Sequence, residues 1–188
     1  MKKFLQFAGL ISLCLAAVGF ILMMTTHSLT YHTAGALGEA NAWYSGVAVI
    51  FGKGPASSSG SILGWGGTLN GEFEGTLAWT ALLAWIFAIA ALVILFLGVL
   101  MPLLKVKAFT KFAGLLNLIA VGLLVVGGIF VFVTLPAFAA ANKWNNTDNW
   151  ALGAGWIIGG ILYIVAGCFA ILPMCADFMA KGKKGKKR

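Results

Sequence analysis

The chain has 188 residues, of which 61% are hydrophobic and only 10% are charged, and its mean hydropathy is +0.97. A typical soluble domain is about 45–50% apolar and about 25% charged, so this chain lacks the polar surface that a water-soluble globule needs. The net charge of +8 comes largely from three basic clusters rather than from an evenly basic surface. These values exclude a soluble enzyme and a soluble nucleic-acid-binding domain, and they predict a membrane protein.

The first predicted membrane span covers residues 4–24. Lys2 and Lys3 precede an apolar run of 21 residues, which is long enough to cross a hydrocarbon core of about 30 Å. A cleaved signal peptide is the alternative, with Ala34-Gly35-Ala36 as its small-residue cleavage site. The apolar core of a signal peptide is about 7–15 residues long, so the length of this run favours a span.

The long segment after the first span is predicted to contain β-structure. Residues 42–51 read AWYSGVAVIF and residues 61–65 read SILGW, which are two runs rich in aromatic and apolar side chains. Between them, the Gly- and Ser-rich residues 52–60 are typical of a turn. The pattern predicts a β-hairpin or a small sheet. In such a strand, Val47, Val49 and Phe51 point to one face, and Ala48 and Ile50 point to the other.

Four aromatic residues of this segment are candidate contacts for a protein partner: Trp43, Tyr44, Phe51 and Trp65. The alternative is a belt of aromatic side chains at the membrane interface. A structured segment of this length exceeds what a connection needs, so we expect a contact with a partner or with a second copy of the chain.

Two histidines and a nearby carboxylate in the same segment, His27, His32 and Glu39, raise the question of a metal site. Nitrogen and carboxylate ligands bind zinc or copper. However, the spacing of five residues between the histidines matches no helical face, and no fourth ligand is evident. We therefore expect neither a metal nor another cofactor.

Three further stretches without charged residues predict spans near residues 78–101, 112–134 and 153–174. A proline lies close to the predicted end of each of these spans, and prolines commonly follow helix ends. These prolines are Pro102, Pro136 and Pro173.

Four spans place both termini on the same side of the membrane, together with the basic residues at 105–111. The excess of lysine and arginine assigns that side to the cytoplasm. The outer loops are then residues 25–77 and 135–152. The chain is predicted to be a multi-pass plasma-membrane protein, with one four-span domain over residues 1–176 and a basic cytoplasmic tail over residues 177–188.

Small residues recur at helical spacing in every predicted span. In the fourth span, Gly155-x-x-x-Gly159 is followed on the same face by Gly167. This motif serves either for dimerisation or for close packing within one bundle. Because all four spans carry such stripes, packing of these glycines inside the chain's own bundle is favoured.

The predicted spans contain almost no ionisable groups, and Asn117 is the only carboxamide clearly within one. Pumps and ion-coupled transporters use intramembrane acids, histidines or arginines, so this absence argues against them. A pore lined by small residues in an oligomer stays open as an alternative. The sequence also shows no nucleophile–base pair and no paired carboxylates, so no enzymatic activity is expected.

The C-terminal tail carries six basic residues in its last eight. Lys183, Lys184, Lys186 and Lys187 are candidate contacts for anionic lipid headgroups. The alternative is a topology signal with a solvated end. Membrane lipids are therefore expected partners, whereas nucleic acid is not.

The order of these elements resembles the claudin-like tetraspan architecture: four spans, cytoplasmic ends, a long first outer loop with strands and a short second one. That family carries a Trp…Gly-Leu-Trp…Cys…Cys pattern in its first loop. Trp43 and Leu63-Gly64-Trp65 echo its first part, with Leu and Gly transposed and both loop cysteines absent, so the family's adhesion and paracellular roles are not carried over. The runs Met1-Lys2-Lys3-Phe4 and Trp43…Val49-Ile50-Phe51-Gly52 also look like small uncharacterised four-span proteins of bacteria.

The expected fold is an all-α membrane protein, a four-helix transmembrane bundle with a small β-hairpin or sheet in its first outer loop. The expected function is that of a non-enzymatic structural or accessory component that contacts its partner through that loop. An oligomeric pore-forming or transport subunit is the alternative function.

Overall fold

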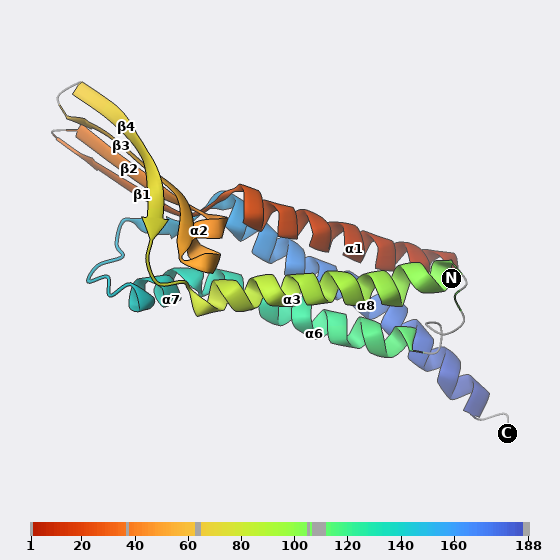
Figure 1. The fold of residues 1–188 in the computed structure, drawn as a ribbon. Helices are drawn as coiled ribbons and strands as arrows, with labels where there is room; N and C mark the ends of the chain where they lie inside the picture. Colours follow the sequence, from red (N-terminus) through yellow and green to blue (C-terminus); the bar gives the residue numbers. More distant parts are fainter. Residues whose placement is uncertain (1, 37, 63–64, 105, 107–111, 186–188) are drawn as a thin grey trace.

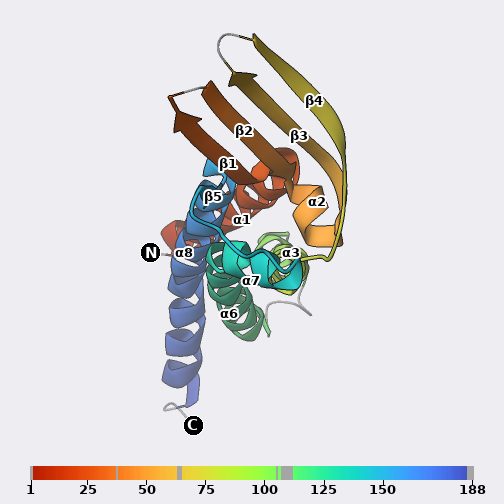
Figure 2. The ribbon, with the colours of Figure 1, turned by 90° about the vertical axis from the view of Figure 1, so that its left-hand side faces the viewer.

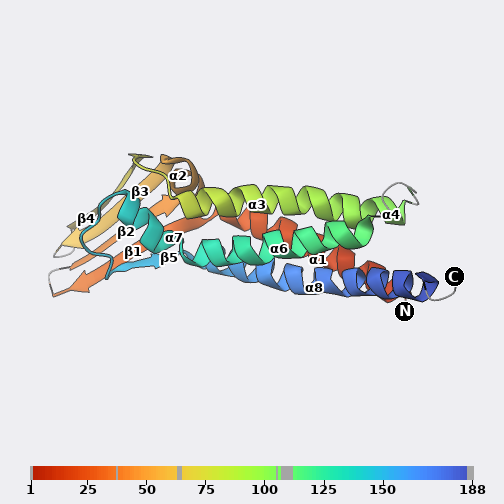
Figure 3. The same ribbon diagram turned by 90° about the horizontal axis from the view of Figure 1, so that it is seen from below.

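The computed structural model of the chain describes residues 2–36, 38–62, 65–104, 106 and 112–185. It shows a bundle of long helices with an antiparallel sheet at one end, and both ends of the chain lie at the opposite end of the bundle (Figures 1 and 3).

Four long helices form the bundle, and each is long and apolar enough to cross a membrane, as predicted. The second of them is interrupted by a π-helical turn, η1, before its last short segment. The helices are α1 (Lys2–Thr25), α3 (Trp79–Leu95) with η1 (Phe96–Leu100) and α4 (Met101–Leu103), α6 (Ala113–Phe132) and α8 (Ala154–Gly185).

The three prolines that were predicted to lie near helix ends all lie in helical segments, and only Pro173 lies far from an end of its helix. Pro136 lies in the first turn of α7 (Thr134–Ala141), just after α6 ends at Phe132. Pro102 lies in α4, because the π-helical turn before it lets the amide of Met101 reach the carbonyl of Phe96, five residues back. This wider turn accommodates a residue that has no amide hydrogen. Pro173 lies within α8, which continues to Gly185. A proline removes only one hydrogen bond of the ladder, and apolar helices tolerate it, so the prediction that Pro173 ends the helix is wrong.

The helices pack in the cyclic order α1, α8, α6 and α3, and α3 also contacts α1. Small side chains are buried at these contacts: on α3, Ala81, Ala84, Ala88 and Ala91 are all buried. The hydroxyl of Ser12 on α1 donates a hydrogen bond to the carbonyl of Ala166 on α8, over 2.7 Å. The first and last long helices of the chain are therefore direct neighbours.

A five-stranded antiparallel sheet extends from the end of the bundle, in the order β4-β3-β2-β1-β5 (Figure 2). Two hairpins supply the four long strands, and the short fifth strand comes from the segment before α8. The strands are β1 (His27–Gly35), β2 (Gly38–Ser45), β3 (Lys53–Ile62), β4 (Trp65–Glu74) and β5 (Trp150–Leu152).

The sheet is larger than predicted, and its strands differ from the prediction. The apolar run 46–51 is a short helix, α2 (Gly46–Phe51), rather than a strand. The side chain of Ser45 caps its first turn, and Gly52 ends it in a left-handed conformation with φ of 75°. The predicted turn at residues 52–60 is mostly strand β3. The chain is thus not all-α, because the sheet occupies most of the segment between α1 and α3.

The helix also changes which apolar residues face inward, so the predicted alternation over residues 47–51 is wrong. Ala48, Val49 and Ile50 are all buried, and Phe51 is 45% exposed. This follows from the helical turn, which places consecutive residues 100° apart rather than on opposite faces. A short apolar run of this kind has the same composition in a buried strand and in a buried helix.

Candidate functional site

The two faces of the sheet differ in chemistry. Side chains alternate along each strand, so Tyr44 and Trp43 in β2 point to opposite faces. The face that carries Tyr44 packs over α7 (Thr134–Ala141) and the segment that follows it. The face that carries Trp43 continues through Asn41 and Glu39 toward the end of the sheet that is farthest from the bundle.

The face over α7 is closed by a cluster of aromatic rings around Tyr44. The ring of Tyr44 lies 4.8 Å from Phe73, 5.8 Å from Phe138 and 5.3 Å from Trp150, measured between centroids. Trp144 packs against both Phe138 and Trp150. Burial in this cluster raises the pKa of the Tyr44 hydroxyl above its ordinary value. Tyr44 therefore contributes to the packing between sheet and helix.

Asn142, just after α7, ties the segment between β4 and α3 to the end of α7. Its side-chain oxygen accepts a hydrogen bond from the amide of Thr76 over 2.9 Å, and its amide group donates to the carbonyl of Thr76 over 2.8 Å. The same amide group donates to the carbonyl of Phe138 over 3.0 Å. This clamp fixes the connection between β4 and α3 to α7.

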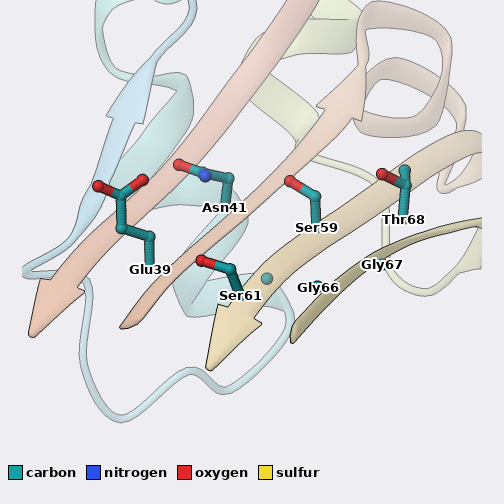
Figure 4. A pocket seen from close by; sticks show the side chains of 8 residues that line it. Glu39, Asn41, Ser59, Ser61, Gly66, Gly67 and Thr68 are labelled. Atoms are coloured by element: carbon teal, nitrogen blue, oxygen red, sulfur yellow. The ribbon is translucent and has the colours of Figure 1, made fainter. Parts of the chain in front are cut away.

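The opposite face of the sheet carries a hollow with polar walls, built by β2, β3 and β4 (Figure 4). Strand register sets two rows across it, Glu39–Ser61–Gly66 and Asn41–Ser59–Thr68. The hollow has a volume of about 350 Å³ and opens to solvent. Its lining residues are Glu39, Asn41, Ser59, Gly60, Ser61, Gly66, Gly67 and Thr68.

Two further interactions order the polar face. Nδ1 of His32 in β1 is hydrogen-bonded to Oδ1 of Asn41, and since that oxygen only accepts, the imidazole nitrogen is the donor. In the next row toward the bundle, Trp43 stacks on His27 with 4.0 Å between ring centroids. In the part of the chain that the structure describes, no three His, Cys, Asp or Glu side chains are grouped to hold a metal ion.

The four aromatic residues that the sequence singled out do not form one patch. Trp43 and Tyr44 lie on opposite faces of the sheet, as their positions in β2 require. Phe51 lies at the end of α2, where its ring packs edge-on against Trp85 of α3 at 5.2 Å between centroids. Trp65 is the first residue of β4, and its side chain lies outside the described residues, as do Leu63 and Gly64.

The three glycines singled out in the fourth span all face other segments of the same chain. A Cβ atom on Gly159 would lie 3.2 Å from the carbonyl oxygen of Gly19 in α1. One on Gly155 would overlap the side chain of Thr26, and one on Gly167 would lie 3.1 Å from Val125 of α6. These positions allow α8 to approach both α1 and α6 closely.

The candidate lipid-binding lysines are described only in part. Lys183 and Lys184 belong to the last turns of α8 by their backbone, and their side chains lie outside the described residues. Lys186 and Lys187 lie outside the described residues altogether. Contacts of the tail with lipid therefore stay a prediction.

Sequence reasoning missed the polar hollow, because its central strand was interpreted as a turn. A signal was present: Ser57, Ser59 and Ser61 recur with the period of two that places them on one face of a strand.

Comparison of the sequence with protein-family models gives no match, and comparison with curated proteins gives none either. The function of the site is therefore argued from its own geometry and chemistry.

Proposed function

We propose that the chain is a multi-pass plasma-membrane protein whose sheet, on the non-cytoplasmic side, acts as a recognition surface, and that it has no enzymatic activity of its own. Two properties of the bundle support the membrane placement. Its four helices have the length and composition of spans, and both ends of the chain lie at the end opposite the sheet. The N-terminal and C-terminal basic clusters thus share one end, which the positive-inside rule assigns to the cytoplasm.

The role in recognition rests on one observation: the polar face of the sheet carries an ordered hollow, whereas the other face is packed against α7 at the end nearest the bundle. A connection between two spans needs only a few residues, but β1 to β4 form two long hairpins in register. Loops held by a rigid scaffold commonly carry binding residues. The face that carries Asn41 and Ser59 is therefore the proposed contact surface.

The orientation is tested by labelling single-cysteine variants in intact cells with a membrane-impermeant maleimide, in a background without the three native cysteines. We expect Ser58→Cys in β3 to be labelled from outside, and Lys184→Cys to be labelled only after the membrane is permeabilised. Labelling of Lys184→Cys in intact cells would overturn the orientation.

The contact surface is tested with two neighbouring serines that alternation places on opposite faces of β3. A photo-crosslinking residue at Ser59 should yield a specific adduct in intact cells, and one at Ser58 should not. A crosslinking residue at Thr68, on the same face, should yield the same adduct. Adding Ser59→Arg to that variant should abolish the adduct without changing thermal stability. Equal crosslinking from positions 58 and 59, or an adduct that survives Ser59→Arg, would contradict the proposed surface.

The same variants separate the recognition role from the pore alternative. In liposomes, a pore-forming oligomer should show ion flux that changes with Ser59→Arg while crosslinking from the sheet persists. That result would replace the recognition role with the alternative function.

A further inference from the structure

The hollow on the polar face has the dimensions of a small-molecule site. Its volume of about 350 Å³ lies within the range of about 300–1,000 Å³ that is common for such sites. The side chains of Glu39, Asn41, Ser59, Ser61 and Thr68 lie on the same side of the sheet (Figure 4). Three adjacent strands hold these side chains, so their spacing is set by backbone pairing.

The lining itself limits the chemistry of the ligand. The lining residues carry hydroxyl, amide and carboxylate groups, along with three glycines, and none of them has a large apolar side chain. A ligand must therefore be held by hydrogen bonds rather than by burial of apolar surface, which excludes an acyl chain or an aromatic molecule.

Charge limits the ligand further. Glu39 is the one ionisable residue among the eight lining residues, so the hollow supplies a negative charge and no positive one. A phosphate, sulfate or carboxylate ligand would be repelled rather than paired. A divalent cation is also a poor fit, because calcium takes six to eight oxygen ligands, commonly with several carboxylates among them.

The polar groups of the hollow are available to a ligand. Among the described residues, no hydrogen bond to another residue is made by the side chains of Glu39, Ser59, Ser61 or Thr68. The bond from His32 engages the oxygen of the Asn41 amide and orients the group, which leaves its two N–H donors for a ligand. The site thus presents a carboxylate acceptor, an amide donor and three hydroxyls that both donate and accept.

We propose that the hollow is a carbohydrate-binding site that takes a neutral sugar unit of a glycan. A sugar carries several neighbouring hydroxyl groups, each both a donor and an acceptor, and this matches the lining. Side chains on adjacent strands stand about 4.7–4.9 Å apart, so groups from two or three strands reach different hydroxyls of one sugar ring. The proposal rests on the proposed function in one respect, since glycans are met on the non-cytoplasmic side.

The experiment uses the full chain in lipid nanodiscs made from phosphatidylcholine, because detergents with sugar headgroups would compete for the site. Binding of maltose, cellobiose, chitobiose and lactose is measured by saturation-transfer NMR, with 3′-sialyllactose as an anionic probe. We expect at least one neutral disaccharide to bind, and the sialylated probe to bind at least tenfold more weakly than the tightest of the neutral disaccharides.

Variants then assign the binding to the hollow. Asn41→Ala should weaken the neutral disaccharide by about tenfold, and Ser59→Arg should abolish its binding. Ser58→Ala, on the opposite face of the same strand, should leave it unchanged. Thermal unfolding of each variant shows whether the fold is kept. Binding is then compared only at temperatures at which all the variants are folded.

Each negative result has its own meaning. If none of the four neutral disaccharides binds, if the sialylated probe binds as well as the tightest of them, or if Ser58→Ala weakens binding as much as Asn41→Ala, the carbohydrate proposal is wrong. If no sugar binds but Ser59→Arg still abolishes crosslinking in cells, the recognition surface stands with another occupant. If sugars bind but Ser58→Cys is not labelled from outside, the site stands and the proposed orientation fails.

Discussion

The bundle and the sheet place their side chains in opposite ways. In the bundle, many buried positions are held by small residues such as Ala84 and Ala120, while large apolar residues such as Phe7 and Val93 are exposed. In the sheet, aromatic rings are packed inside against α7, and hydroxyl and amide groups line the outer hollow. The first arrangement suits helices surrounded by lipid, where close approach rather than apolar burial drives association. The second suits a sheet surrounded by water.

The bundle is therefore stabilised by close packing of helices and the sheet by burial of aromatic rings, and the two regions meet around the end of α1. At the end of α1, the carbonyl of Met23 accepts a hydrogen bond from Nε1 of the fully buried Trp156 over 3.0 Å. Gly46 of α2 packs against the backbone of Met23 at the end of α1, and Gly153 before α8 packs against the backbone of His27 at the start of β1. Substitutions at this junction should have larger effects than substitutions in either region alone.

The largest effect is expected for Gly46→Ala. A Cβ atom at this position would overlap the carbonyl oxygen of Met23, a backbone atom that a side-chain rotation does not move. We expect a loss of about 3 kcal/mol, the upper end for overpacking, visible as a large fall in the midpoint of thermal unfolding in detergent. Gly71→Ala in β4 is the control, because, its chain neighbours aside, no described residue lies within 4 Å of the added methyl group. Equal midpoints for the two variants would show that α2 is not packed on α1.

A smaller loss is expected for Gly159→Leu, which tests the bundle alone. The added side chain would press on Gly19 and Met23 of α1, so we expect about 1–3 kcal/mol of destabilisation. The matched control is Gly122→Leu on α6, where the position is open. If Gly159→Leu kept the parent's stability and only changed a dimer into a monomer, the glycine would serve an interface between chains instead.

The smallest effect concerns the aromatic face of the sheet. Because burial raises the pKa of Tyr44, the folded state keeps a proton that the unfolded chain releases above its ordinary pKa of 10. The stability that this pKa difference contributes is fully present below pH 10, and it is lost as the pH rises toward the folded-state pKa. Thermal unfolding between pH 9 and 11 should show Tyr44→Phe losing less stability than the parent. Parallel losses in the two proteins would mean that the hydroxyl is solvated.

The bundle could be predicted from the sequence because a span is a property of composition. About 20 uncharged apolar residues suffice to identify it, whatever they pack against. Composition does not locate the ends of the helices. A proline commonly marks a helix end in soluble proteins, but Pro173 lies within α8. Composition also could not show the π-helical turn that accommodates Pro102.

The sheet was only partly predictable, because its strands depend on their neighbours. Strand β3 contains Ser57, Ser58, Ser59 and Gly60, which have low intrinsic preference for strands, yet it is paired on both sides from Ala56 to Ile62. Conversely, the apolar run after Ser45 forms a helix, since that serine caps its first turn. The hollow was missed because it exists only once three strands are placed in register.

The direct contact between α1 and α8 has a consequence for how the protein is made. Ser12 and Ala166, and Met23 and Trp156, are bonded across 154 and 133 positions of sequence. The strand that follows α1 and the strand that precedes α8, β1 and β5, also pair with each other. A ribosome synthesises α1 first and α8 last, so the first helix emerges long before its main neighbour. Until α8 is inserted, the face of α1 that carries Ser12 and Gly19 lacks its main neighbour, and a nascent chain that stops after α6 leaves that face open to the factors that recognise unassembled helices.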